Sequence, residues 1–195
     1  MKGERLRYST VSLSYPTGCY WGTEKFVVKD FQKQFPGSIK DAKVGFMSPD
    51  KDAMENPSYR QVCSGETGHV EVLWVELEDP ATTFEPLIRF FFQFHDPTTL
   101  NAQGNDVGTQ YASAIFCGDD EQKRIAEKVK NELQSLIDAG KVKYRMNKVE
   151  TGIFDTNPFY PAHEEHQDYL TKNPLGYCNH AYRFKEWPSA DKDEL

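Results

Sequence analysis

Apolar residues recur along this chain with two periods, a period of two that is typical of strands and a period of 3.6 that is typical of helices. Residues 69–77 are almost continuously apolar, as expected for a central strand. The clearest helix spans 119–139, where Ile125 and Val129 share one face and Gly140 follows the end. The same patterns predict strands at 8–14, 38–47, 109–116 and 142–149, and helices at 23–34, 82–94 and 162–172.

The order of these elements predicts the fold class. The first six are strand, helix, strand, strand, helix and strand, which matches a ferredoxin-like βαββαβ core with two layers. A doubly wound fold is disfavoured because no helix separates the strands at 38–47 and 69–77. We therefore expect an α+β fold with extra helices, in a single domain over residues 1–195. It includes an N-terminal extension at 1–7 and a long irregular C-terminal tail at 174–195.

Two shorter segments carry local signals. Thr82 and Glu85 have the spacing of a capping box at the start of the helix at 82–94. Residues 48–68 are rich in proline, asparagine, serine and glycine. A connection of this length is typical of a functional loop.

Composition narrows the class of protein. The 195 residues suit one domain, and 13% aromatic residues within 38% hydrophobic residues indicate a globular fold rather than disorder. The net charge of −7 comes without a basic block, so we expect no nucleic-acid partner. No stretch of about 18 apolar residues occurs, so we expect no membrane span. Four cysteines are too few for a disulfide scaffold.

The two ends of the chain differ in targeting information. Residues 1–5 lack the apolar core of a signal peptide. The last four residues, Lys192–Leu195, spell an endoplasmic-reticulum retention signal. The KDEL receptor reads that signal only on a protein already in the lumen, so we expect a lumenal protein whose leader peptide is missing from this chain. A cytoplasmic location is the fallback if the tetrapeptide is accidental.

Cys19 is the first candidate for chemistry. It lies between Gly18 and Gly22, where a strand turns into a helix. The positive end of a helix dipole favours thiolate over thiol and lowers the pKa of the cysteine. Tyr20 and Trp21 could form an apolar wall beside it, suited to a methyl or thioether group. The alternative is that Cys19 is a buried structural cysteine and that the two aromatic residues belong to the core.

Glu71 is the candidate proton donor. It interrupts an apolar strand, where poor solvation is expected to raise the pKa of its carboxyl and let it donate a proton at neutral pH. The alternative is a solvent-facing position on a half-exposed strand. Tyr59, Asp106 and Tyr111 lie in or beside polar loops and could hydrogen-bond one substrate oxygen, although their spacing alone does not require it.

The other cysteines and the late histidines suggest separate roles. Cys178 lies in the tail beyond the last expected helix, which suits a resolving cysteine that attacks an oxidised first cysteine. Cys63 and Cys117 are expected to be structural. His163 and His166 have i, i+3 spacing rather than the i, i+4 spacing of zincins, so we expect no metal site.

Several ordered blocks of the sequence resemble the A-type peptide methionine sulfoxide reductases. The similarity runs from about Cys19 to Cys178, which is most of the chain. Blocks in register are far more specific together than any one of them alone. The blocks are Gly18-Cys19-Tyr20-Trp21-Gly22, Asn56-Pro57-Ser58-Tyr59-Arg60-Gln61-Val62-Cys63-Ser64-Gly65 with Thr67-Gly68-His69-Val70-Glu71, His95-Asp96-Pro97, Gln103-Gly104-Asn105-Asp106-Val107-Gly108-Thr109-Gln110-Tyr111, and Pro161-Ala162 with His166-Gln167-Asp168-Tyr169-Leu170.

The resemblance implies an oxidoreductase that reduces the S epimer of methionine sulfoxide, free or in proteins, to methionine. Cys19 matches the nucleophile that attacks the sulfoxide sulfur and becomes a sulfenic acid. Tyr20 and Trp21 match the pair that holds the sulfoxide methyl group. Glu71 matches the acid that protonates the sulfoxide oxygen.

The remaining roles also follow from the resemblance. Tyr59 and Tyr111 match the hydroxyls that bind the sulfoxide oxygen, and Asp106 matches the residue that orients the substrate. Cys178 matches the resolving cysteine, whose disulfide with Cys19 is reduced by an external dithiol, thioredoxin or a disulfide-isomerase-like protein. The family needs no metal and no bound organic cofactor. We expect a monomer that repairs oxidised proteins under oxidative stress.

The sequence departs from the family pattern at four positions. Tyr20 replaces the commoner phenylalanine and brings a hydroxyl that needs a partner. Ala102 and Ala112 stand where arginine is frequent, and His163 stands where glutamate is frequent. These differences bear on substrate preference and on the reductant more than on the reaction.

Two other classes of function remain open. Another thiol-dependent enzyme, a cysteine hydrolase or a thiol peroxidase, could use Cys19. A hydrolase needs an imidazole within hydrogen-bonding reach of the thiol, and no histidine lies near Cys19 in sequence. A non-enzymatic, metal-binding lumenal module built on the tail histidines is the second alternative.

Overall fold

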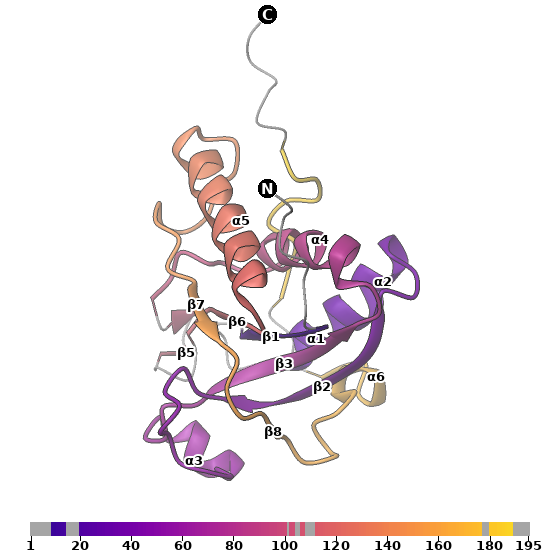
Figure 1. The fold of residues 1–195 in the computed structure, drawn as a ribbon, viewed down its shortest axis with the longest axis vertical. Helices are drawn as coiled ribbons and strands as arrows, with labels where there is room; N and C mark the ends of the chain where they lie inside the picture. The colour runs from indigo at the N-terminus through magenta and orange to yellow at the C-terminus, as the bar shows by residue number, and fades with distance from the viewer. Residues whose placement is uncertain are drawn as a thin grey trace, which may run out of the picture.

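A six-stranded sheet with the order β7-β6-β1-β3-β2-β8 forms the centre of the computed structural model (Figure 1). The structure describes residues 9–14, 20–100, 102–103, 106–107, 112–176 and 180–188. A separate two-stranded sheet pairs β4 (Ala102–Gln103) with β5 (Asp106–Val107). The strands of the main sheet are β1 (Thr10–Ser14), β2 (Ile39–Met47), β3 (Val70–Leu77), β6 (Ala114–Cys117), β7 (Gly152–Asp155) and β8 (Tyr160–Pro161).

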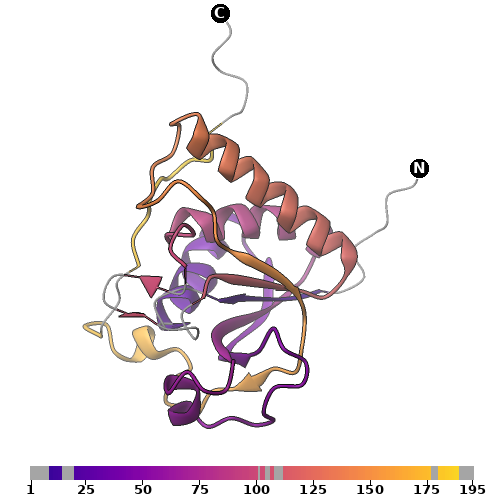
Figure 2. The same cartoon turned by 90° about the vertical axis from the view of Figure 1, so that its left-hand side faces the viewer.

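Seven helical segments surround the sheet in the described part of the chain. They are α1 (Tyr20–Glu24), the π-helical η1 (Lys25–Phe31), α2 (Gln32–Gln34), α3 (Tyr59–Cys63), α4 (Pro80–Gln93), α5 (Asp120–Asp138) and α6 (Tyr169–Lys172). Figures 1 and 2 show α4 and α5 together on one side of the sheet, with α3 and β8 at the other end of the molecule. Within the described ranges, no helix is both long and apolar enough to cross a bilayer.

The main core lies between the sheet and the helices. Leu73, Val75 and Leu77 of β3 belong to this core, whereas Val70 and Val72 belong to a smaller cluster. Successive residues of a strand point to opposite faces, so the two clusters lie on opposite sides of the sheet. Glu71 shares the face of the main core.

The predicted α+β, ferredoxin-like fold is confirmed. Strand β3 lies between β1 and β2, the two strands that the first helical segment connects. The three pairings within β6-β1-β3-β2 are all antiparallel, as in a split βαβ arrangement. At the edges, β7 runs parallel to β6 and β8 runs antiparallel to β2.

The long helices form where their apolar patterns predict them. Helix α5 begins after Asp119, whose carboxylate accepts a hydrogen bond from the Gln122 amide. It ends before Gly140, which has a φ of +69° that glycine adopts without strain. At the start of α4 the cap is Asp79 rather than the predicted Thr82, since the Asp79 carboxylate accepts from the Ala81 amide.

The strand predicted at 142–149 is wrong, and the strand that pairs with β6 is β7. In residues 142–149, backbone amides donate hydrogen bonds to side chains rather than to a neighbouring strand. The Arg145 amide donates to Asp96 Oδ2, and the Val149 amide donates to Gln134 Oε1. The apolar side chains of the segment still enter the core, which explains why its pattern resembled a strand.

The helix predicted at 162–172 is also wrong over most of its length, because only α6 is helical. The Gln167 side chain pairs with the backbone of Val44 as a neighbouring strand would. Its Oε1 accepts from the Val44 amide, and its Nε2 donates to the Val44 carbonyl. Asp168 follows with a left-handed φ of +53°, which ends any continuous helix at that point.

One helix was not predicted at all. Helix α3 lies inside the segment 48–68, which was predicted to be a loop. Ser58 and Gln61 form a reciprocal capping box at its start. This cap holds Tyr59 at the first position of the helix.

We predict that Gln167→Ala lowers the free energy of unfolding by about 1–3 kcal/mol, because it leaves the Val44 amide without its acceptor, while the Val44 carbonyl keeps the Ala162 amide as a donor. Urea unfolding monitored by circular dichroism measures this. Glu164→Ala is the matched control, since Glu164 is exposed on the same segment. An equal change in both variants would contradict the role assigned to Gln167.

Candidate active site

A hydrogen bond anchors the start of α1 to the sheet. The Tyr20 amide donates to Glu71 Oε2 at 3.3 Å. The first amides of a helix have no partner within the helix, and the positive end of its dipole attracts a negative group. A carboxyl oxygen of Glu71 on the neighbouring strand therefore supplies an acceptor for the Tyr20 amide.

Glu71 is buried, with 5% of its surface exposed. Its partner across the sheet is Phe46 of β2. The Phe46 ring lies 6.1 Å from the Tyr20 ring and 6.4 Å from the Tyr59 ring. A carboxyl group buried to this extent depends on hydrogen-bond donors such as the Tyr20 amide.

Aromatic rings from α1, α3 and α6 contact one another or His166 near the start of α1. Trp21 stacks on Tyr169 of α6 at 3.7 Å between ring centroids. His166 lies 5.8 Å from Trp21 and 4.8 Å from Tyr59. We call Tyr20, Trp21, Tyr59, His166 and Tyr169 the aromatic cluster.

The structure therefore brings four of the predicted site residues together, namely Tyr20, Trp21, Tyr59 and Glu71. Three others, Cys19, Tyr111 and Cys178, lie outside the described residues. The backbone of Asp106 lies in β5, and its side chain is not among those described.

His166 and Tyr169 were not predicted to contribute to this cluster. Burial lowers the pKa of His166, the Glu165 carboxylate opposes that change, and His163 adds to it. A neutral imidazole is therefore favoured at neutral pH. The signal in the sequence was the histidine and the aromatic residue within 166–169. It was missed because a continuous helix was expected there.

Glu24 is a second residue that the sequence did not reveal. It is buried at the end of α1, and its Oε1 accepts a hydrogen bond from the Asp168 amide at 3.0 Å. Burial raises the pKa of this carboxyl to about 7, and the Asp168 charge adds to that rise. The Asp168 amide hydrogen bond and the Lys172 charge oppose it. The bond ties α1 to the residue before α6, and so supports the stacking of Trp21 on Tyr169.

The two described cysteines are not activated thiols. Burial raises the pKa of Cys117 to about 12, which fits the predicted structural role. Cys63 is exposed on α3, where partial desolvation raises the pKa of its thiol and the Glu71 charge adds to the rise. A hydrogen bond with Tyr59 opposes it. Across the described residues, no group of three His, Cys, Asp or Glu side chains is arranged to hold a metal ion.

Comparison with known proteins decides the family. A family model described as "Peptide methionine sulfoxide reductase" matches residues 12–193. The chain belongs to the peptide methionine sulfoxide reductase family. This is a family of oxidoreductases, as its name states.

Individual relatives agree with the family. The probable peptide methionine sulfoxide reductase of Schizosaccharomyces pombe is 39% identical over 82% of this chain and 88% of its own. Among solved structures, reduced Mxr1 from Saccharomyces cerevisiae is similar, with a TM-score of 0.75 and 38% identity over 94% of this chain and 96% of that chain. Methionine sulfoxide reductase A of Corynebacterium diphtheriae has a TM-score of 0.68 and 32% identity, over 92% of this chain and 81% of that chain.

We predict that Glu24 makes stability depend on pH. Its raised pKa means that the folded protein binds this proton more tightly than the unfolded chain does. The stabilisation is fully present below the unfolded pKa of about 4.5 and is lost as the pH rises through 7. Relative to Glu24→Gln, which keeps an acceptor for the Asp168 amide, the wild type should lose up to about 3 kcal/mol over that range.

Denaturant unfolding at pH 4.5 and pH 7.5 measures this difference. Glu127→Gln, at an exposed position on α5, is the control for the loss of one carboxylate. If the wild type and Glu24→Gln change in parallel with pH, the carboxyl does not titrate as described.

Proposed function

We propose that the protein reduces the S epimer of methionine sulfoxide, free or in polypeptides, with Cys19 as the nucleophile. The observation that carries the proposal is the contact between the Tyr20 amide and Glu71. Cys19 is joined to Tyr20 by the peptide bond that contributes this amide. The aromatic cluster around the same point supports a pocket for a thioether.

The proposed reaction has two steps, reduction of the sulfoxide by Cys19 and formation of the Cys19–Cys178 disulfide. The Cys19 thiolate forms a bond to the sulfoxide sulfur while Glu71 delivers a proton to the sulfoxide oxygen. The hydroxyl group then moves from the substrate sulfur to the Cys19 sulfur as the bond between the two sulfurs breaks, so methionine leaves and Cys19 becomes a sulfenic acid. The Cys178 thiol then attacks that sulfur, releasing water and forming a Cys19–Cys178 disulfide, which an external dithiol reduces.

Substrate orientation follows from the positions of the two groups of side chains. Tyr20 and Trp21 of α1 form the proposed methyl pocket, and Tyr169 extends it by stacking on Trp21. Glu71 and Tyr59 come from other elements and face the proposed oxygen, together with Tyr111, while Asp106 orients the substrate. A methyl pocket, an oxygen site and a fixed direction of attack by Cys19 together select one hand at sulfur, which supports S-epimer specificity.

The proposed reductant is a dithiol of the thioredoxin fold. The structure of Mxr1 from Saccharomyces cerevisiae in complex with Trx2 is similar to this chain, with a TM-score of 0.54 and 26% identity. Lys192–Leu195 spells the retention signal, so we further propose that the enzyme acts in the endoplasmic-reticulum lumen. A disulfide-isomerase-like dithiol is then the reductant, and the KDEL receptor is a partner.

The function is tested by single-turnover reduction of blocked methionine sulfoxide with dithiothreitol. The wild type should reduce the S epimer and leave the R epimer unchanged. Glu71→Gln should slow the S-epimer reaction by about 10²–10⁴-fold, because it removes the proton donor. Equal turnover of both epimers refutes the proposed specificity, and a wild-type rate in Glu71→Gln refutes the acid role.

The lumenal proposal makes a redox prediction. Thioredoxin has a potential of about −270 mV and the lumen about −180 to −210 mV. The Cys19–Cys178 disulfide should therefore have a potential above about −270 mV, so that a weaker reductant can open it.

Titration against glutathione measures this potential. Cys178→Ser is the control, since it should still release methionine in one turnover but form no disulfide with Cys19. A potential well below about −300 mV would remove the lumenal proposal and leave the reductase function standing.

A further inference from the structure

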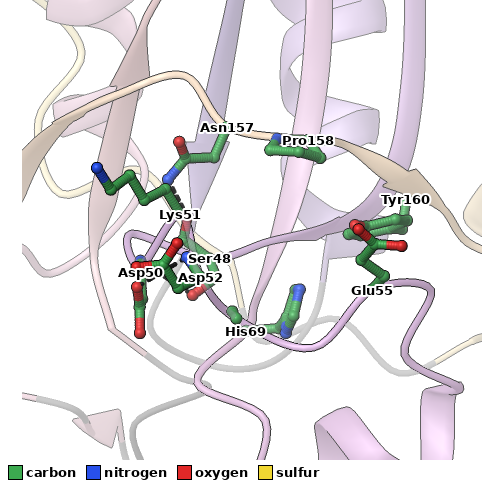
Figure 3. Close-up of a pocket in the computed structure, with 10 residues that line it drawn as sticks. Ser48, Asp50, Lys51, Asp52, Glu55, His69, Asn157, Pro158 and Tyr160 are labelled. Carbon is green, nitrogen blue, oxygen red and sulfur yellow. Dashed lines mark hydrogen bonds between the residues drawn. The ribbon is translucent and has the colours of Figure 1, made fainter.

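A hollow of about 380 Å³ is lined by the loop that follows β2, by His69 and by the segment that leads into β8. Figure 3 shows the loop that carries Ser48 to Glu55 on one side of it and the segment from Asn157 to Tyr160 on the other. His69 lies between these two segments, at the base of the hollow (Figure 3).

Strand register places this hollow next to Glu71. His69 comes two residues before Glu71, and Tyr160 of β8 pairs with Phe46, which in turn pairs with Glu71. Paired residues and residues two apart share one face of a sheet. The His69 ring accordingly lies 5.7 Å from the Tyr160 ring. The Cα atoms of two such strand residues are about 6.7 Å apart.

His69 presents an acceptor to the hollow. Only 2% of its surface is exposed, and its Nδ1 is 3.1 Å from the Thr67 carbonyl oxygen. A carbonyl oxygen only accepts, so Nδ1 carries the proton and Nε2 of the neutral ring is a lone-pair acceptor. Burial lowers the pKa of His69, which keeps the ring neutral. Within the described residues Nε2 has no hydrogen-bond partner.

The charges around the hollow are predominantly negative. Asp50, Asp52 and Glu55 line it, and Lys51 is the one cationic side chain among the described residues that do so. None of these four forms an ion pair within the described part of the chain. The Asp50 carboxylate accepts only from the Asp52 amide, so most acceptor capacity remains available. A buried neutral acceptor beneath three carboxylates fits a group that is cationic and donates several hydrogen bonds.

We propose that this hollow is a substrate subsite that binds the guanidinium or ammonium group of an arginine or lysine two residues from the oxidised methionine. The proposal rests on the proposed function. In an extended peptide, residues two apart point the same way and lie about 6.7 Å apart. Glu71 lies in β3, and His69, the residue directly before that strand, comes two positions earlier in the chain. A metal ion is the poorer occupant, because the described residues hold no three-ligand group for one.

The test uses peptides that contain S-methionine sulfoxide and one arginine, placed at each position from three residues before to three residues after it. A matched series replaces arginine by citrulline, which has nearly the same shape and no charge. With dithiothreitol as reductant, kcat/KM for arginine two residues away should exceed that for citrulline by about threefold to tenfold, mainly through KM. The double variant Asp52→Asn/Glu55→Gln should lose this preference.

Two controls make the result specific. Glu127→Gln, on α5 at the far side of the molecule, should keep the preference for arginine (Figure 1). Reduction of blocked methionine sulfoxide should be unchanged in the double variant, because neither carboxylate belongs to the proposed reaction.

Failure of the subsite and failure of the function are distinguishable. If blocked S-methionine sulfoxide is not reduced, the proposed function fails and the subsite fails with it. If it is reduced but arginine and citrulline peptides are equivalent at every position, the subsite alone is overturned. A loss of preference in Glu127→Gln as well overturns it in favour of general electrostatic attraction. An effect of the double variant seen only with thioredoxin assigns the hollow to reductant docking instead.

Discussion

The hydrogen bond from the Tyr20 amide to the Glu71 carboxylate is the interaction on which the candidate site depends. A helix start leaves amides without partners, and a buried carboxyl group is costly without donors. The Tyr20 amide is a donor for the carboxyl group, and the carboxyl oxygen is an acceptor for the amide. This bond ties α1 to β3, and it lies where the Tyr20 ring packs against Phe46, the residue that pairs with Glu71.

A second constraint holds the opposite wall of the cluster. The segment 166–169 has almost no regular structure, yet two side chains attach it to the rest of the fold by hydrogen bonds. Gln167 takes the backbone groups of Val44, and Glu24 takes the Asp168 amide. Polar side chains here form the hydrogen bonds to the backbone that a helix or strand forms within itself. As a result, Tyr169 is held against Trp21.

These contacts explain which parts of the site could be predicted. Glu71 was found because a carboxyl group within an apolar strand is a local signal, and β3 and α5 were found because their patterns are long. Glu24 and Gln167 were missed because their partners lie 144 and 123 residues away. A glutamate in a short helix looks solvent-facing until the fold buries it. The wrong strand at 142–149 has the same origin, since distant side chains took its backbone donors.

Two different polar groups lie two residues apart at the start of β3, His69 directly before the strand and Glu71 within it. Glu71 is buried under α1, so its environment is set by the helix start and the aromatic cluster. The carboxylates of Asp50, Asp52 and Glu55 are exposed, and water screens them from the buried group. The loop can therefore change its charge with little effect on the proposed proton donor. For this physical reason, the proposed subsite and the proposed reaction at sulfur are separable.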